Sequence, residues 1–275
     1  MSGRTMICLV SLNIFSVIPT RALISGSFEH NVVGSRGYSE AGSTVMKFDI
    51  EPQGDQCVVI RLGGEDVSIL NAKVHAITRL INKERVAGVV EVVPAYVSLG
   101  VFYDSEAAAF DDLCASLRST IVEPKQLEPV AARVFDIPVC YDEPYGPDLA
   151  SVAESHALTA DEVILMHTSA LYTVAMIGFT PGFPYLLGLP ALLSTPRREQ
   201  PRQLVAAGSV GIGGRQTGIY SLDSPGGWNI IGRTPLRLFR PSDDEPSLLK
   251  AGDAVRFVEI SEPLYRTMNE HTREN

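Results

Sequence analysis

The feature that most limits the fold of this chain is the alternation of short apolar segments with Gly/Pro turns from Leu171 onward. Each apolar segment has the length and the β-branched or aromatic content of a strand. Many short strands without a long helix are typical of a closed barrel, because closure leaves no strand edge unpaired. The strands that we expect are 172–177, 209–212, 217–220, 228–231, 236–239 and 254–258.

The segment before this region predicts one further strand and two short helices. Thr159 and Glu162 have the spacing of a capping box, which would fix the start of the second helix. The expected elements are a strand at 134–140 and helices at 151–156 and 159–166. We therefore expect a C-terminal β-barrel domain over residues 130–265.

Residues 46–125 predict a small N-terminal domain of a different kind. A β-branched run at 57–60 indicates a buried strand, and apolar residues at helical spacing predict an amphipathic helix at 66–83. Two more strands follow at 89–93 and 97–103, and then a helix that Ser105 could cap. The order β-α-β-β-α predicts a ferredoxin-like sandwich with both helices on one face of the sheet. The fold class of the whole chain is then α+β.

Residues 1–45 are expected to lie outside the fold. The apolar stretch 6–18 resembles the core of a short signal peptide, but no clear cleavage pattern follows around Ala22 and Ser25. We interpret the segment as an extension that arises from an over-long translation start. Secretion or organelle targeting is the alternative. A second segment without periodicity, 121–132, is expected to link the two domains.

The composition argues against several kinds of partner and site. The chain has 275 residues and a net charge of −9, and such a surface repels the phosphates of nucleic acids. Its four cysteines are scattered without a CxxC pair, which is typical of buried thiols in a reducing compartment and predicts a cytoplasmic protein. The sequence has no HExxH motif or Cys/His quartet and no membrane-spanning stretch, so we expect neither a metal site nor a membrane partner.

The Gly-rich run at 208–218 is the first candidate for a functional site. It lacks the GxxxxGK[ST] order of a phosphate loop, and no long helix follows it. We interpret it as a strand–turn–strand whose turn carries Arg215 and Gln216. A guanidinium suits a carboxylate or phosphate, and an amide can both donate and accept hydrogen bonds. A barrel corner with solvated side chains is the alternative.

Two aromatic and basic segments are further candidates. Phe179 and Phe183 lie among prolines, as in a rigid apolar loop that lines a pocket or is held against the core. Arg197, Arg198 and Arg202 could bind a carboxylate, a phosphorylated intermediate or the acidic face of a partner. Solvated arginines are the alternative.

His167 is the candidate for proton transfer. It ends a predicted helix just before a strand, and a histidine can act as an acid or a base near neutral pH. A structural role is the alternative. No G-x-S-x-G elbow or ordered Ser/His/Asp set is present, so the chain by itself looks like half of an active site.

The stretch from His167 to Phe239 resembles the allophanate hydrolase subunit 1 family, which is cyclophilin-like and includes the 5-oxoprolinase B subunits and the kinase inhibitor KipI. The resemblance is carried by GFTPGFPYL, STPRR and AGSVGIGGRQTGIYSLDSPGGWNIIGRTPLRLF in this order. It extends to GVVEVVPAYVSL at 88–99 and so covers roughly residues 48–260. The chain departs from the family pattern at Ala206, where proline is usual, and at Gly213, where alanine is usual.

The resemblance implies an N-terminal ferredoxin-like domain, a C-terminal cyclophilin-like β-barrel and a shared activity. The chain would be the B subunit of an ATP-dependent 5-oxoprolinase that opens the lactam of 5-oxoproline to give glutamate. Its partners would be a C subunit of the allophanate hydrolase subunit 2 type and the A subunit of the same enzyme. ATP, with Mg, would be bound by the complex, and the chain would be inactive alone. A KipI-type inhibitor of a histidine kinase, or a component of allophanate or urea metabolism, is the alternative.

The resemblance also assigns roles to individual side chains. The implied catalytic residues transfer a proton, stabilise an anion and orient the lactam, and they are His167, Arg215 and Gln216. The implied substrate-binding residues are Arg198, Thr217, Arg233, Phe179 and Phe183. We expect them to share one cleft.

Overall fold

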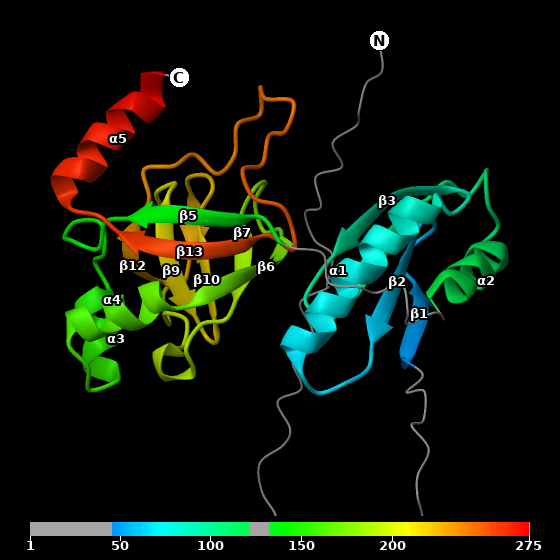
Figure 1. The fold of residues 1–275 in the computed structure, drawn as a ribbon, viewed down its shortest axis with the longest axis horizontal. Coiled ribbons are helices and arrows are strands. Elements are labelled where there is room, and N and C mark those ends of the chain that lie inside the picture. The colour runs from blue at the N-terminus through cyan, green and yellow to red at the C-terminus, as the bar shows by residue number, and fades with distance from the viewer. Residues whose placement is uncertain (1–45, 122–131, 275) are drawn as a thin grey trace, which may run out of the picture.

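The computed structural model describes residues 46–121 and 132–274, which form two sheets with their helices (Figure 1). The fold is mixed α+β, as the sequence predicts. The segment 1–45 and nearly all of the expected linker lie outside the described residues.

The N-terminal sheet has four strands in the order β1-β2-β4-β3, and neighbouring strands are antiparallel. β2 and β3 therefore run parallel on either side of β4, and α1 connects them. The apolar faces of α1 and α2 both pack on this sheet and form one core with it. The elements are β1 (Phe48–Pro52), β2 (Cys57–Leu62), α1 (Val67–Glu84), β3 (Val89–Pro94), β4 (Ser98–Tyr103) and α2 (Phe110–Ile121).

The helix expected at 66–83 is confirmed as α1, and its start has a clear local cause. The side chain of Asp66 accepts hydrogen bonds from the backbone N–H groups of Ser68 and Ile69, at 2.8 and 3.0 Å. The strand order was incomplete, because β1 was not predicted. α2 begins at Phe110 rather than just after Ser105.

The C-terminal sheet has seven strands in the order β12-β9-β10-β7-β6-β13-β5. Its strands are β5 (Val134–Val139), β6 (Leu171–Ile177), β7 (Pro184–Leu187), β9 (Ser209–Gly213), β10 (Gln216–Ile219), β12 (Asn229–Arg233) and β13 (Ala254–Glu259). The two edge strands meet, because Cys140 after β5 exchanges two backbone hydrogen bonds of 2.9 Å with Arg233 of β12. The expected barrel is thus confirmed as a nearly closed sheet. Its shape is consistent with a cyclophilin-like fold.

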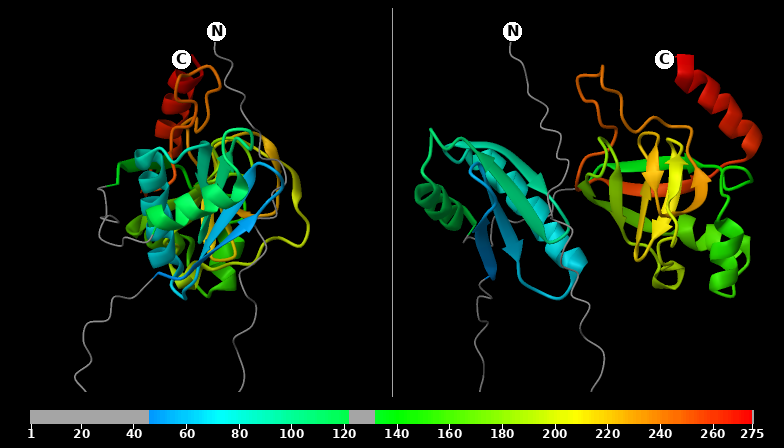
Figure 2. Two further views of the ribbon diagram at one scale, coloured as in Figure 1. Left: turned by 90° about the vertical axis from the view of Figure 1, so that its right-hand side faces the viewer. Right: turned by 180° about the vertical axis from the view of Figure 1, so that it is seen from behind.

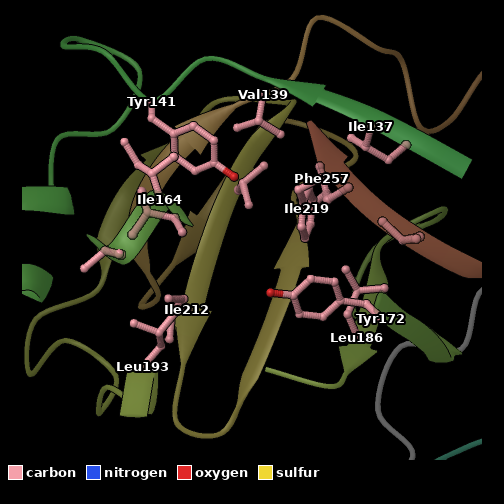
Figure 3. Packing of buried hydrophobic residues seen from close by; sticks show 14 of the residues in the cluster. Ile137, Val139, Tyr141, Ile164, Tyr172, Leu186, Leu193, Ile212, Ile219 and Phe257 are labelled. Carbon is pink, nitrogen blue, oxygen red and sulfur yellow. The ribbon is translucent and has the colours of Figure 1, made fainter. Parts of the chain in front are cut away.

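The barrel interior is filled by aliphatic and aromatic side chains from most of the strands, including Val139, Tyr172, Ile212, Ile219 and Phe257 (Figure 3). Helices α3 (Leu149–Ser155) and α4 (Ala160–Ser169) add apolar side chains to this core at one end of the barrel (Figure 1). A filled interior of this kind leaves no channel for a substrate, so a binding site has to lie on the barrel's rim or outer surface.

The capping box predicted at the start of α4 is confirmed, with Thr159 and Glu162 bonded reciprocally. Other expectations for the barrel region were wrong. Residues 236–239 do not form a strand, and a 13-residue helix, α5 (Glu262–Glu274), closes the described chain where no long helix was expected. A separate pair of short strands, β8 (Arg202–Val205) and β11 (Ser224–Gly226), was also not predicted.

The two sheets are joined by polar and aromatic contacts. The side-chain amide of Asn71 in α1 donates to the carbonyls of Ala95 and Tyr96, both at 3.0 Å, and of Ala175 in β6, at 3.2 Å. Ala95 is also buried in a cluster of barrel side chains. Figure 2 shows the N-terminal sheet and the barrel side by side from behind.

Candidate functional site

A single buried carboxylate organises the arginine-rich segment. Asp148, at the start of α3, accepts hydrogen bonds of 2.8 Å from Arg198 and from both terminal nitrogens of Arg202. It also accepts one of 2.7 Å from the backbone N–H of Ile230. Both guanidinium groups thus point toward a carboxylate of the same chain. The two arginines and Asp148 together carry a net charge of +1. Arg198 would have to share its guanidinium between Asp148 and any substrate.

The third arginine of this segment lies against an aromatic cluster. Arg197 is 5.9 Å above the ring of Trp228. The cluster consists of the barrel residues Phe183, Tyr185, Tyr220 and Trp228 together with Tyr96 from the loop between β3 and β4. Phe183 is therefore a core residue of this cluster and has almost no exposed surface.

Phe179 lies at the exposed edge of the same cluster. Its ring contacts Phe183 edge-on at 5.5 Å, but 51% of the residue is exposed. Its φ is 69°, in the left-handed region that non-glycine residues rarely adopt. The loop therefore holds an aromatic side chain at the surface at some cost in backbone energy, a pattern that is frequent at functional sites.

His167 lies at the end of α4 and is fully enclosed in the barrel core, stacked on Phe257 at 4.4 Å. Its Nδ1 is 2.8 Å from the hydroxyl of Tyr141, and its Nε2 is 3.2 Å from the hydroxyl of Thr217. Thr217 donates its one proton to the carbonyl of Gly211, at 3.0 Å. Nε2 must then donate and Nδ1 accept, so the neutral ring has a partner at each nitrogen.

Burial lowers the pKa of His167 to about 3, because the charged ring would lose its hydration inside the barrel. The imidazole is therefore neutral at physiological pH. In this position it supports the packing of α4 against β10 and β13. Its role in proton transfer stays a prediction.

Arg215 and Gln216 lie where the sequence predicts them, at a tight turn between β9 and β10. Gln216 pairs with Gly213, so Gly214 and Arg215 form the turn itself. Gly214 has a φ of +66°, which glycine adopts without strain. The strand–turn–strand interpretation of the Gly-rich run is confirmed. Arg215 is exposed.

Arg233 is the one predicted residue that lines a described hollow. The hollow has a volume of about 480 Å³ and lies between the rim of the barrel and α5. Tyr265 of α5 forms a hydrogen bond with Arg233, which partly offsets the rise that burial causes in the pKa of the Tyr265 phenol.

The structure brings only some of the predicted residues together. His167 and Thr217 are hydrogen-bonded inside the barrel, and Phe179 and Phe183 are in contact outside it. The hollow that Arg233 lines includes neither Arg198 nor Arg215. The single cleft that we expected stays a prediction.

Sequence reasoning missed Asp148, which binds Arg198 and Arg202, and Tyr265, which contacts Arg233. The sequence signal for Asp148 was weak but present, because an aspartate just before a helix is a common cap. No three His, Cys, Asp or Glu side chains within 46–121 and 132–274 converge on a possible metal site.

Comparison with known proteins gives this geometry a family context. Residues 48–249 match the family described as carboxyltransferase domain, subdomain C and D. The chain belongs to the carboxyltransferase subdomain C and D family. The membership expected from the sequence motifs, in the group that includes the 5-oxoprolinase B subunits, is thereby confirmed.

Within this family the chain is similar to curated proteins over most of their length. It is 41% identical to the 5-oxoprolinase B subunit of Bacillus subtilis (strain 168) over 237 residues, which are 82% of this chain and 99% of the relative. It is 49% identical to the Escherichia coli O157:H7 protein of the same name over 170 residues, 62% of this chain and 78% of the relative.

A solved structure of the same fold is larger. The crystal structure of the protein TTHA0988 superposes with a TM-score of 0.66 at 36% identity and covers 76% of this chain. This chain spans only 40% of that one.

Proposed function

We propose that this family member is the B subunit of an ATP-dependent 5-oxoprolinase and acts with the A and C subunits of that enzyme to hydrolyse 5-oxoproline to L-glutamate. The observation that carries the proposal is the 41% identity to a 5-oxoprolinase B subunit across 99% of its length. An unstrained lactam resists hydrolysis. Phosphorylating its oxygen creates a reactive carbon, and positive charge must then offset the developing anion.

The arrangement of side chains supports a chain that is incomplete alone. Arg215 is exposed on the turn between β9 and β10, and Phe179 is exposed on a strained loop. Within the proposal, Arg198 and Arg215 stabilise the anion and Gln216 orients the lactam. Proton transfer by His167 requires that its ring becomes accessible in the assembled complex, because the ring is fully buried in this chain. Thr217, Arg233, Phe179 and Phe183 complete the set, and another polypeptide of the complex supplies the rest of the cleft.

The Gly-rich run does not form a phosphate loop that would hold ATP. The Gly-rich run is a hairpin with a two-residue turn, so its backbone N–H groups pair across strands rather than converge on a phosphate. We therefore assign ATP and Mg to the assembled complex and derive no step through them.

Two coarser features of the chain belong to the same proposal. The order of β1, β2, β4 and β3 with two helices on one face supports a ferredoxin-like class for 46–125, with β1 in the place of the strand that would follow α2. The barrel would occupy 130–265.

None of the described helices has both the length and the apolar content needed to cross a bilayer. We propose that the complex works in the cytoplasm.

The proposal is tested by reconstitution. The chain is co-expressed with candidate A and C subunits, and glutamate release from 5-oxoproline is measured with and without ATP. ATP-dependent release is expected only when all three are present. If the complete set forms and releases no glutamate, the proposal is wrong, and inhibition of histidine kinase autophosphorylation becomes the activity to measure.

The Arg215→Ala variant tests the proposed site within that assay. Loss of a guanidinium that contacts developing charge should lower activity at least about tenfold. Arg256→Ala is the matched control, because Arg256 is also exposed but lies on β13 in an ion pair with Asp136. Full activity of Arg215→Ala would remove Arg215 from the site.

A further inference from the structure

The hollow beside Arg233 has the size of a small-molecule site. Its volume of about 480 Å³ falls in the range of roughly 300–1,000 Å³ that such sites occupy. The rim of the barrel contributes Gly208, Arg233, Thr234 and Arg237, and α5 contributes Tyr265 and Asn269. Figure 1 shows α5 rising beside the barrel at this end.

The wall of the hollow is built by a close backbone contact. Gly208 has a φ of +83°, and the N–H of Thr234 donates to its carbonyl at 2.9 Å. A side chain at position 208 would collide with the carbonyl of Thr234 and crowd Arg233. Glycine at position 208 therefore allows its backbone to lie against that of Thr234, and this contact holds Arg233 in the wall of the hollow.

The charge of the hollow favours an anion. Two arginines, Arg233 and Arg237, line it together with one carboxylate, Asp223. Asp223 already accepts the backbone N–H of Ala207 at 2.8 Å. The Nε of Arg233 is buried and has no hydrogen-bond partner among the described residues, although the same side chain bonds to Tyr265. A buried donor without an acceptor is unfavourable, and a ligand oxygen would satisfy it after a shift of the enclosed Arg233 side chain.

We propose that this hollow binds a small oxyanion, a carboxylate or a phosphate group, through Arg233 and Arg237. The side-chain amide of Asn269 offers a further N–H donor from α5. This inference shares Arg233 with the substrate-binding set of the proposed function, but it is tested as anion binding by the chain alone, so that its failure and the failure of the proposed function are distinguishable.

The test is a titration of the full chain, followed by nuclear magnetic resonance of its backbone amides. Inorganic phosphate and acetate are added in separate series at constant ionic strength. Saturable shifts at Gly208, Thr234 and Asn269 are expected with at least one of them, and the tighter-binding anion identifies the chemistry. Shifts that do not saturate, or that arise elsewhere on the chain, would overturn the proposal.

Variants separate a specific site from general charge. Arg233→Gln should weaken binding at least about tenfold, and the more exposed Arg237→Gln several-fold, as expected for charge-assisted hydrogen bonds. Arg237→Gln guards against a folding defect, because Arg233 lies in β12. Arg240→Gln removes the same charge outside the hollow and should bind like the wild type. Equal affinity in all three variants, whether reduced or unchanged, would contradict the site.

Discussion

Asp148 shows how much of the barrel's edge depends on one side chain. It receives N–H groups from two arginines and from the backbone of Ile230, so it ties the start of α3 to residues 198–202 and to β12. Both arginines are partly exposed, with 37% and 27% of their side chains accessible, whereas the carboxylate is 7% accessible. The carboxylate is thus the group that most needs its partners.

We expect Asp148→Asn to lower the free energy of unfolding by about 2–3 kcal/mol, somewhat less than for a fully buried ion pair, because water partly solvates the arginines. Urea denaturation measures this loss. Asp136→Asn is the control, because its ion pair with Arg256 is exposed on both sides and should hardly change the unfolding midpoint. Equal midpoints for the two variants would show that Asp148 has no special role.

Because His167 is buried, we expect the free energy of unfolding to depend on pH. Burial lowers its folded-state pKa to about 3, below the value of about 6.5 in an unfolded chain. Between pH 3 and pH 6.5 the unfolded state therefore binds more protons at this histidine than the folded state does. The contribution of the neutral ring to the free energy of unfolding is complete above pH 6.5 and is lost as the pH falls toward 3. His75, with a pKa lowered to about 4 by burial first and by Arg79 second, acts in the same direction.

The measurement is the free energy of unfolding between pH 7 and pH 5. We expect it to fall with decreasing pH, and His167→Gln should reduce the slope by up to about 1.4 kcal/mol per pH unit. The ring signals of His167 should show no titration above pH 5. Titration near pH 6.5 would instead mean that the ring is accessible, as a proton-transfer role requires.

At the scale of elements, the hairpin of β9 and β10 is shaped by its contact with Trp228. A Cβ atom at Gly213 would lie 2.5 Å from the indole nitrogen of Trp228, too close for the buried ring to remain in place. We expect Gly213→Ala to cost about 1–3 kcal/mol in thermal or urea unfolding, as overpacking does. Gly63→Ala is the control, since its nearest neighbour would be 3.6 Å away. A neutral Gly213→Ala would show that the ring can move.

The elements that are marked by residues close to them in the chain were predictable from the sequence. α1 and α4 have apolar periodicity and capping side chains within three residues of their starts, so the sequence itself specifies them. β1 and α5 were missed because both are mostly exposed and lack an apolar run. The apolar stretch at 236–239 has the composition of a strand, but only Phe239 pairs, with Ser247.

The candidate site was predictable only where its geometry is local. The turn that carries Arg215 follows from its glycines. The bond between Arg202 and Asp148 joins residues 54 positions apart, and the contact of Arg233 with Tyr265 depends on an unpredicted helix. Periodicity and spacing contain no information about such pairs.

On the scale of the whole molecule, Asn71 links the two sheets. Its amide group reaches carbonyls of both the N-terminal sheet and β6 of the barrel, and its oxygen lies 2.9 Å from Nε2 of His75. Asn71→Ala leaves these buried groups without partners and should lower the free energy of unfolding by about 1–3 kcal/mol.

We also expect Asn71→Ala to loosen the junction, with faster amide exchange in β6 and a larger radius of gyration in X-ray scattering. Thr78→Ala is the control, because Thr78 bonds only to the carbonyl of Val74 within α1. If both variants keep the wild-type radius and exchange rates, the junction does not depend on Asn71.

The position of β5 in the barrel has a consequence for biosynthesis. β5 is the first strand of its sheet along the chain, yet its ladder partner is the last one, β13, so that Val134 pairs with Ala254. The ion pair between Asp136 and Arg256 likewise joins residues 120 positions apart. A ribosome therefore releases β5 long before its neighbour exists. The strand has to wait without a ladder partner until translation of the barrel is almost finished, which makes closure a late and comparatively slow event.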